Sequence, residues 1–267
     1  MLVALALGAL GACGRGDGKG ASSDRTRVST STRVAAAGGD TAALPQDNRG
    51  RGGEASAAPP TVLFIGTSLT AGLGLDPDSA YPAIIQRKID SLGLGFRVVN
   101  AGVSGETSAD ALRRIGWLMR APASVIVLET GANDGLRGLD PDSTEANIQQ
   151  IIDSVHADQP DAALLLVQME ALPNFGMRYT TAFHDMYPQL ARRNGLTLVP
   201  FLLAGVAGNP ALNQADGVHP NNRGEKIVAA NVWRALRPVL ERVRARHATF
   251  RSPPRPDARR GAPGAAG

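Results

Sequence analysis

Thr61-Val-Leu-Phe-Ile-Gly66, followed directly by Thr67-Ser68-Leu69-Thr70, is the stretch of sequence that decides the fold. Its uninterrupted run of Val, Leu, Phe and Ile predicts a strand that is buried on both faces. Four more apolar runs follow, and stretches with the three-to-four-residue spacing of amphipathic helices separate them. The sequence therefore predicts an α/β fold of the three-layer α/β/α type, a doubly wound sheet of about five parallel strands.

The expected elements alternate along the chain. Strands are expected at residues 61–66, 96–100, 124–129, 162–168 and 196–200. Helices are expected at residues 80–92, 107–120, 143–158, 178–194 and 222–246. Ligands of such sheets bind outside the carboxyl ends of the strands. Residues that follow a strand are therefore the first candidates for a functional site.

The folded domain is expected to span residues 61–247, because both flanking segments lack the large apolar side chains of a core. Gly, Ala, Ser, Thr, Asp and Arg dominate residues 14–60, and Arg, Pro, Gly and Ala dominate residues 248–267. Both segments are therefore predicted to be disordered, the first as a linker and the second as a basic tail.

The basic excess of the chain belongs to these flanks. Residues 14–60 hold 7 Lys/Arg and 5 Asp/Glu, and residues 248–267 hold 4 Arg and 1 Asp. The chain has 28 basic and 24 acidic residues in all, so the domain keeps 17 and 18, a net charge of −1. A domain with this balance is no basic platform for nucleic acid, and nucleic acid is not expected as a partner.

Cys13 is the only cysteine, and it ends the uncharged, mostly apolar segment 1–13. Such a segment is too short to span a bilayer but suits the apolar part of a signal. Leu10-Gly11-Ala12-Cys13 resembles the bacterial lipobox, although the usual preceding positive charges are missing. The expectation is an exported periplasmic or cell-envelope lipoprotein tethered through Cys13, at the outer membrane of a Gram-negative host because Gly14 follows. The alternative is an ordinary signal peptide cut nearby, with Cys13 incidental.

Four residues, three polar and one glycine, are expected to lie at the carboxyl edge of the sheet. Ser68 follows the first strand, Gly105 the second and Asn133 the third, while His219 precedes the last helix. Acyl transfer needs a nucleophile, a base, a group that orients the base, and donors for an oxyanion. These four positions can supply most of that set.

His219 is the best candidate for the base, because Asp216 lies three residues before it in a Gly- and Pro-marked loop. Asp216 can accept the Nδ1–H of the imidazole and leave Nε2 facing Ser68 as the nucleophile. Taken alone, Ser68 also fits a helix N-cap, and Asp216 with His219 also fits a cap of the last helix. His156 and His184 fall within expected helices and lack this combination.

Donors for the oxyanion are expected from three positions. The backbone N–H groups of Ser68 and Gly105 and the side-chain amide of Asn133 can converge on one point. Each of these residues taken singly is equally compatible with an ordinary turn. No cluster of His, Cys or carboxylates has metal-ligand spacing near them, so neither a metal nor a cofactor is expected.

These blocks resemble the four defining blocks of the SGNH hydrolases, also called GDSL esterases/lipases, over about residues 62–240. The similarity is greatest to the bacterial arylesterase, lysophospholipase and acyl-CoA thioesterase I branch. It is carried by Val99-Asn-Ala-Gly-Val-Ser-Gly-Glu-Thr-Ser108, Glu129-Thr-Gly-Ala-Asn-Asp-Gly-Leu-Arg-Gly138, Leu172-Pro-Asn-Phe-Gly-Met-Arg-Tyr179 and Asp216-Gly-Val-His-Pro-Asn221. The resemblance implies a flavodoxin-like fold, a Ser68-Asp216-His219 triad, and an oxyanion hole of Ser68, Gly105 and Asn133. It also implies action on acyl esters or thioesters without metal or cofactor.

One position departs from the pattern of that family. The family usually has Asp before the nucleophile, and this chain has Thr67. The change removes a negative charge beside Ser68 but keeps a hydroxyl for local hydrogen bonds. Asp134, next to Asn133, is interpreted as a residue that holds its loop.

Apolar residues near the expected site favour an acyl chain or a lysophospholipid as substrate, and a monomer is expected. The candidate substrate-binding residues are Leu69, Leu136, Leu172, Phe175 and Met177, all of which are equally compatible with core packing. One alternative function is a carbohydrate O-deacetylase of the cell envelope. Another is a non-catalytic lipoprotein that binds acyl groups, which the full set of catalytic residue types argues against.

Overall fold

The computed structural model describes residues 58–251 of the 267-residue chain. The signal segment 1–13 with Cys13, nearly all of the linker 14–60, and residues 252–267 of the tail lie outside the described residues. Within the described part, no helix combines the length and apolar character needed to cross a membrane.

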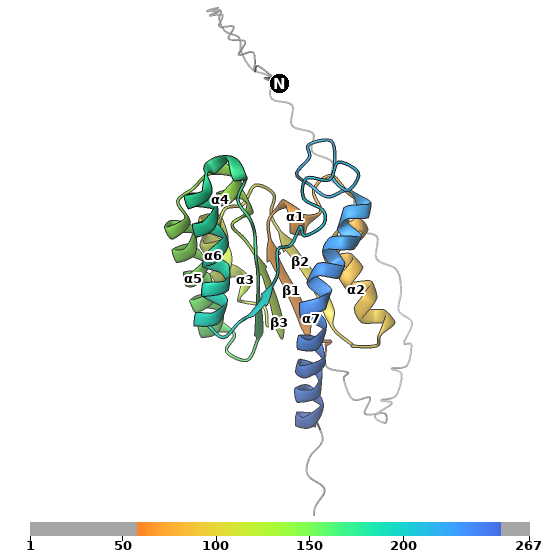
Figure 1. The fold of residues 1–267 in the computed structure, drawn as a ribbon. Coiled ribbons are helices and arrows are strands. Elements are labelled where there is room, and N and C mark those ends of the chain that lie inside the picture. The colour runs from red at the N-terminus through yellow and green to blue at the C-terminus, as the bar shows by residue number, and fades with distance from the viewer. Residues whose placement is uncertain (1–57, 252–267) are drawn as a thin grey trace, which may run out of the picture. The chain divides into compact units, whose positions relative to one another are not determined.

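A single sheet of five parallel strands forms the centre of the fold (Figure 1). Its order is β2-β1-β3-β4-β5, the flavodoxin-like order, and the predicted α/β class is confirmed. Val62, Phe64 and Ile65 of β1 are buried, as is all of β3, because helices cover both faces of these strands. The strands are β1 (Thr61–Gly66), β2 (Arg97–Gly102), β3 (Val125–Glu129), β4 (Ala163–Val167) and β5 (Thr197–Val199).

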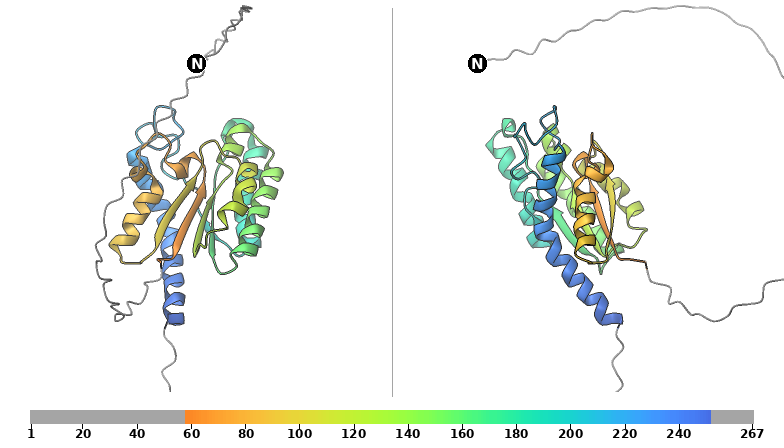
Figure 2. Two further views of the ribbon diagram at one scale, coloured as in Figure 1. Left: turned by 180° about the vertical axis from the view of Figure 1, so that it is seen from behind. Right: turned by 90° about the vertical axis from the view of Figure 1, so that its right-hand side faces the viewer.

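Two layers of helices enclose the sheet, as Figures 1 and 2 show. One layer holds α2 (Tyr81–Ser91) and α7 (Asn222–Arg251), which pack on each other. The other holds α3 (Ser108–Leu118), α5 (Pro141–Asp158) and α6 (Met177–Arg193), with α5 in contact with both neighbours. This division follows from the strand order, because β1 to β2 runs outward in one direction and the later crossovers run in the other.

Short helical elements at the carboxyl edge were not predicted from the sequence. They are α1 (Ser68–Ala71), α4 (Ala132–Arg137) and the 3-10 turns η1 (Pro77–Ser79) and η2 (Pro173–Phe175). Elements of three to six residues are too short to show the spacing of an apolar face. The last helix also runs to Arg251, past the predicted helix end at 246 and the predicted domain boundary at 247 (Figure 2).

A buried carboxylate joins α7 to α2. Glu225, in the first turn of α7, is 2% exposed and accepts a hydrogen bond from the backbone N–H of Tyr81 at 2.6 Å. Burial raises the pKa of Glu225 from 4.5 to about 8, and the Tyr81 hydrogen bond only partly opposes that rise. The protonated form is therefore favoured in the folded state.

We expect Glu225→Gln to stabilise the protein progressively as the pH rises from 5 to 8. The folded pKa of Glu225 lies above the unfolded value, so the wild type loses stability from about pH 4.5 upward until pH passes about 8. The loss is about 1.4 kcal/mol per pH unit at most, and a neutral Gln avoids it. Urea unfolding at pH 5, 6.5 and 8 measures the effect. Glu241→Gln, at an exposed surface pair with Arg237 in the same helix, is the control. A stability difference between Glu225→Gln and wild type that is constant with pH would contradict the expectation.

Candidate active site

Ser68 lies at the sharp turn where β1 ends and the short helix α1 begins. Thr67 is the N-cap of α1, and its side chain accepts a hydrogen bond from the Leu69 N–H at 3.4 Å. Ser68 is the first helical residue and is only 7% exposed. The Ser68 N–H has no acceptor inside the helix, because the first amides of any helix lack one. The alternative interpretation of Ser68 as the N-cap therefore does not hold, since Thr67 has that role.

The structure brings Ser68, His219 and Asp216 into one line. His219 Nε2 lies 2.8 Å from Ser68 Oγ, and His219 Nδ1 lies 2.8 Å from Asp216 Oδ2. With Nδ1 protonated and donating to Asp216, Nε2 is left to accept from the serine hydroxyl. Ser68 and His219 are 151 residues apart in the chain, whereas His219 and Asp216 are three residues apart.

Asp216 is held by the backbone of its own loop. Its Oδ1 accepts from the N–H groups of Val218 at 2.9 Å and His219 at 3.0 Å. These two backbone donors and the His219 side chain lower the pKa of Asp216 to about 2, with the His219 N–H the largest cause. Gly217 has φ +72°, a conformation that other residues rarely adopt, and this permits the tight loop. Asp216 therefore stays ionised throughout the neutral range.

Gln214 links the His219 loop to the Ser68 turn. Its backbone N–H donates to the His219 carbonyl at 2.7 Å. Its side-chain Nε2 donates to the carbonyls of Leu73 at 2.7 Å and Pro220 at 3.0 Å. Leu73 lies just beyond α1, so one side chain fixes the relative position of the loops that carry the hydroxyl and the imidazole. This role of Gln214 could not be predicted from the sequence, because a Gln in a loop has many possible partners.

The three expected oxyanion donors lie at the same cavity. Ser68, Gly105 and Asn133 all line it, together with His219. Asn133 Nδ2 donates to the Glu106 carbonyl at 2.9 Å, which orients the amide and leaves its second N–H. Gly105 has φ +79°, and no residue between 58 and 251 accepts a hydrogen bond from its N–H.

Asp134 and Arg137 hold the Gly105 loop in place. A loop-holding role is expected from the sequence for Asp134 but not for Arg137. Asp134 is 2% exposed and accepts from the Ser108 N–H at 2.9 Å and the Ser108 hydroxyl at 2.5 Å, at the start of α3. Arg137 Nη2 donates to the Gly105 carbonyl at 3.0 Å. The geometry thus agrees with a loop-holding role for Asp134 and adds Arg137, whose contact could not be read from the sequence.

The cavity beside Ser68 has a volume of about 220 Å³ and mostly apolar walls. Of the candidate substrate-binding residues, Leu69 and Leu136 line it. Leu73, Ala132 and Val218 complete its walls. Leu172, Phe175 and Met177 do not line this cavity. The ring of Phe175 instead lies against Gly138, the C-cap of α4.

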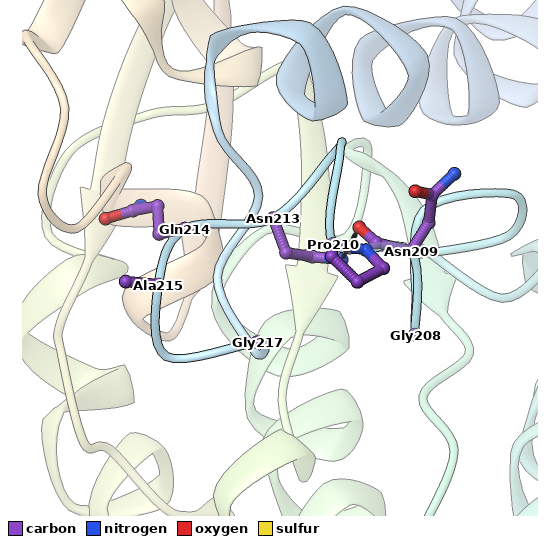
Figure 3. Close-up of a pocket in the computed structure, with 7 residues that line it drawn as sticks. All are labelled: Gly208, Asn209, Pro210, Asn213, Gln214, Ala215 and Gly217. Carbon is purple, nitrogen blue, oxygen red and sulfur yellow. Dashed lines mark hydrogen bonds between the residues drawn. The ribbon is translucent and has the colours of Figure 1, made fainter.

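A second cavity, of about 420 Å³, lies within the loop that precedes Asp216 (Figure 3). Asn213 points toward Asn209 and Pro210 there and donates to the carbonyls of Asn209 at 2.9 Å and Val206 at 2.8 Å. Gln214 is directed away to the other side of the loop. This larger cavity contains neither Ser68 nor His219, so we place the chemistry in the smaller one.

The remaining histidines of the described chain lie elsewhere. His184 Nδ1 lies 2.8 Å from Glu170 Oε1 and 3.0 Å from Gln168 Nε2, which makes a second histidine–carboxylate pair. His156 is in the last turn of α5. Among residues 58–251, no three His, Cys, Asp or Glu side chains are grouped so that they could hold a metal ion.

A buried carboxylate lies directly behind the serine turn. Glu129, the last residue of β3, is fully buried and accepts from the Thr67 N–H at 2.7 Å. The Thr67 hydroxyl lies 3.0 Å from both Glu129 oxygens, and the Thr70 hydroxyl donates to Oε2 at 2.9 Å. Burial raises the pKa of Glu129, and the hydrogen bonds from Thr67 and Thr70 oppose that rise. The sequence showed Glu129 only as the end of an apolar strand.

Known proteins are similar to this chain in both sequence and fold. The GDSL-like Lipase/Acylhydrolase family matches residues 64–227. The Esterase TesA of Pseudomonas aeruginosa is 38% identical over 69% of this chain and 91% of its own length. The Thioesterase 1/protease 1/lysophospholipase L1 of Escherichia coli K12 is 37% identical over 69% of this chain and 87% of its own. A crystal structure of TesA superposes with a TM-score of 0.64 at 38% identity, over 67% of this chain and 99% of that one.

We expect Thr67→Asp to make stability depend on pH, because it places a second carboxyl group against Glu129. One proton can be shared by the pair at pH 5, which raises an apparent pKa in the folded state. Stability should then fall as the pH rises through that raised pKa, by about 1–3 kcal/mol between pH 5 and 8. Urea unfolding at both values measures it.

Thr67→Asn is the uncharged control for this prediction and should show no added pH dependence. Thr67→Asp combined with Glu129→Gln leaves a single carboxyl group and should abolish the added dependence. An equal loss for Asp and Asn at both pH values would mean that side-chain size, and not charge, governs this position.

Proposed function

This chain belongs to the GDSL-like lipase/acylhydrolase family and is a carboxylic ester hydrolase, and from that premise we propose that Ser68, His219 and Asp216 are its catalytic triad. The proposed substrates are acyl esters or thioesters, cleaved through an acyl-enzyme. The observation that carries the proposal is the continuous line of hydrogen bonds from Asp216 through His219 to Ser68. Relatives named as esterase, thioesterase and lysophospholipase support the substrate class.

In the proposed acylation step, Ser68 Oγ attacks the carbonyl carbon while its proton passes to His219 Nε2. Asp216 keeps Nδ1–H in place and stabilises the imidazolium that forms. The carbonyl oxygen takes the negative charge of the tetrahedral intermediate. That intermediate then expels the alcohol or thiol, which takes the proton from Nε2, and the acyl group stays on Oγ.

The proposed oxyanion donors are the N–H groups of Ser68 and Gly105 and the free N–H of the Asn133 amide. All three belong to residues around the cavity, and each is held by the fold before substrate arrives. Donors fixed in this way stabilise the developing charge without reorganisation, and one donor is typically worth ~10²–10³ in turnover. Water activated by His219 then releases the acid by the reverse sequence of proton transfers.

The walls of the cavity support acyl groups larger than acetyl. Leu69, Leu73 and Leu136 surround the space next to Ser68, and apolar walls favour methylene groups over the hydroxyls of a carbohydrate. Removal of acetyl groups from carbohydrate, the alternative left open by the sequence, has no comparable support at this cavity. p-Nitrophenyl esters of graded chain length compared with acetylated xylan distinguish the two activities.

We expect Ser68→Ala to lower kcat on p-nitrophenyl butyrate by ~10⁴-fold or more, because no other group can form the acyl-enzyme. The fold should be unchanged, since Ala suits the first turn of a helix. Ser104→Ala is the matched control, because Ser104 is an exposed serine beside Gly105. Turnover near wild type in Ser68→Ala would reject the triad.

We also expect His219→Ala to be nearly as damaging as Ser68→Ala, because the hydroxyl then lacks a base. His184→Ala should retain wild-type kcat, although His184 also pairs with a carboxylate. Asp216→Asn should cause a smaller loss than His219→Ala. Steady-state kinetics of the three variants test the assignment, and equal losses for His184→Ala and His219→Ala would point to a different base.

A further inference from the structure

A third cavity of the described residues, of about 540 Å³, lies on the face of the sheet beside α3. It is larger than the two cavities described above and shares no lining residue with either of them. Its volume falls within the ~300–1,000 Å³ that is usual for sites of small organic ligands. The proposed hydrolysis at Ser68 gives this cavity no role.

The floor of the cavity belongs to β1 and to the edge strand β2. Thr61 and Leu63 of β1 stand in register with Arg97 and Val99 of β2, and all four residues line the cavity. β2 is the first strand in the sheet order, beside α2 (Figure 1), and none of its six residues is buried. Because α2 packs on the other face of β2, the cavity opens on the side of α3.

Apolar side chains form most of the wall of this cavity. Leu118, the last residue of α3, is buried, and Pro122 extends the wall beyond the helix. Trp117 also lines the cavity and is 66% exposed. An indole with so much area in water is unfavourable until another apolar group packs against it. The wall therefore offers an aromatic surface to a ligand.

Three arginines line the cavity, and no Asp or Glu does. Arg114 is already neutralised, because it forms an ion pair with Glu106. The Arg97 guanidinium group has one long contact, a donation to Thr61 Oγ1 at 3.4 Å. Within residues 58–251, neither Arg97 nor Arg120 pairs with a carboxylate. Two unpaired guanidinium groups at an apolar cavity favour an anionic ligand.

The aromatic surface and the two free arginines border the same cavity from two elements. The Arg120 N–H donates to the Trp117 carbonyl at 3.3 Å, just after the end of α3, so one turn of chain carries both side chains. Arg97 reaches the cavity from the start of β2. A ligand in the cavity can therefore contact the indole and both guanidinium groups.

We propose that this cavity is a binding site for a small aromatic carboxylate. The ring of the ligand packs on Trp117 and Leu118, and its carboxylate group accepts hydrogen bonds from Arg97 and Arg120. A planar guanidinium group binds a carboxylate through two parallel hydrogen bonds, and apolar walls favour a ring over a hydroxylated body such as a carbohydrate. The inference is independent of the ester hydrolysis proposed at Ser68.

Two other occupants match the cavity less well. Residues 14–60 lead directly to Thr61, but this segment carries a net charge of +2 and lacks large apolar side chains. Such a segment complements neither the two arginines nor the indole of Trp117. An inorganic anion such as phosphate would satisfy the arginines and leave the indole in water. An aromatic carboxylate satisfies both.

The two tryptophans of the chain allow binding to be measured at the cavity itself. Trp233→Phe leaves Trp117 as the one indole, and Cys13→Ser in the same full-length chain excludes a lipid anchor. The probe is 3-phenylpropionate, because its phenyl ring does not absorb the light that excites an indole. We expect a saturable change in Trp117 emission, with a Kd of about 0.1 mM or below.

Matched ligands and variants separate the contribution of charge from that of apolar contact. 3-Phenylpropionamide keeps the ring without the charge, and acetate keeps the charge without the ring, so each should bind about tenfold or more weakly than 3-phenylpropionate. Arg97→Gln combined with Arg120→Gln should weaken 3-phenylpropionate about tenfold or more and leave the amide unchanged. Arg242→Gln combined with Arg244→Gln, at two exposed arginines of α7, is the matched control and should change neither.

Isothermal titration calorimetry of the Cys13→Ser chain with both tryptophans gives a second reading that does not depend on how Trp233→Phe folds. Equal Kd values for the carboxylate and the amide, or for the two arginine pairs, would overturn the proposal. Binding by calorimetry that the Arg97 and Arg120 pair does not weaken would place the ligand elsewhere and would also overturn it. Trp117 emission that is already that of a buried indole and does not respond to the probe would assign the cavity to another segment of this chain, with the same consequence.

Discussion

The common direction of the five strands is the constraint on which the site depends. Every segment that leaves a strand does so at the same edge, so residues far apart in sequence meet without any special folding of their loops. Ser68 and His219 are 151 residues apart and still lie 2.8 Å from each other. Reversing even one strand would send its loop, and whatever chemistry it carries, to the opposite end of the sheet.

Buried carboxylates secure the two sides of this edge at an energetic cost. Glu129 holds the turn before Ser68 through Thr67, and Glu225 holds the start of α7, which follows the His219 loop, against α2. Burial raises the pKa of each, which shows that ionisation is opposed at both places. Because each carboxylate accepts a backbone N–H, the cost is offset where the chain must not move.

Much of this could be predicted from the sequence, for identifiable reasons. The apolar runs predict the strands and their buried character. Relative to those runs, a common place at the carboxyl edge of the sheet is predicted for Ser68, Gly105, Asn133 and His219. What could not be predicted depends on contacts across the sheet. Glu129 ends an apolar strand, and nothing local reveals that it accepts from Thr67. Leu172, Phe175 and Met177 follow β4 as expected, but the ring of Phe175 packs against Gly138 at the end of α4 and none of the three lines the cavity.

The carboxyl edge of the sheet therefore carries polar groups inside the cavity and apolar side chains outside it. The hydrogen-bonding groups of Ser68, His219 and Asn133 line the cavity next to α1 and α4. Leu172, Phe175 and Met177 stand outside it, where they are costly in water because exposed apolar area is unfavourable.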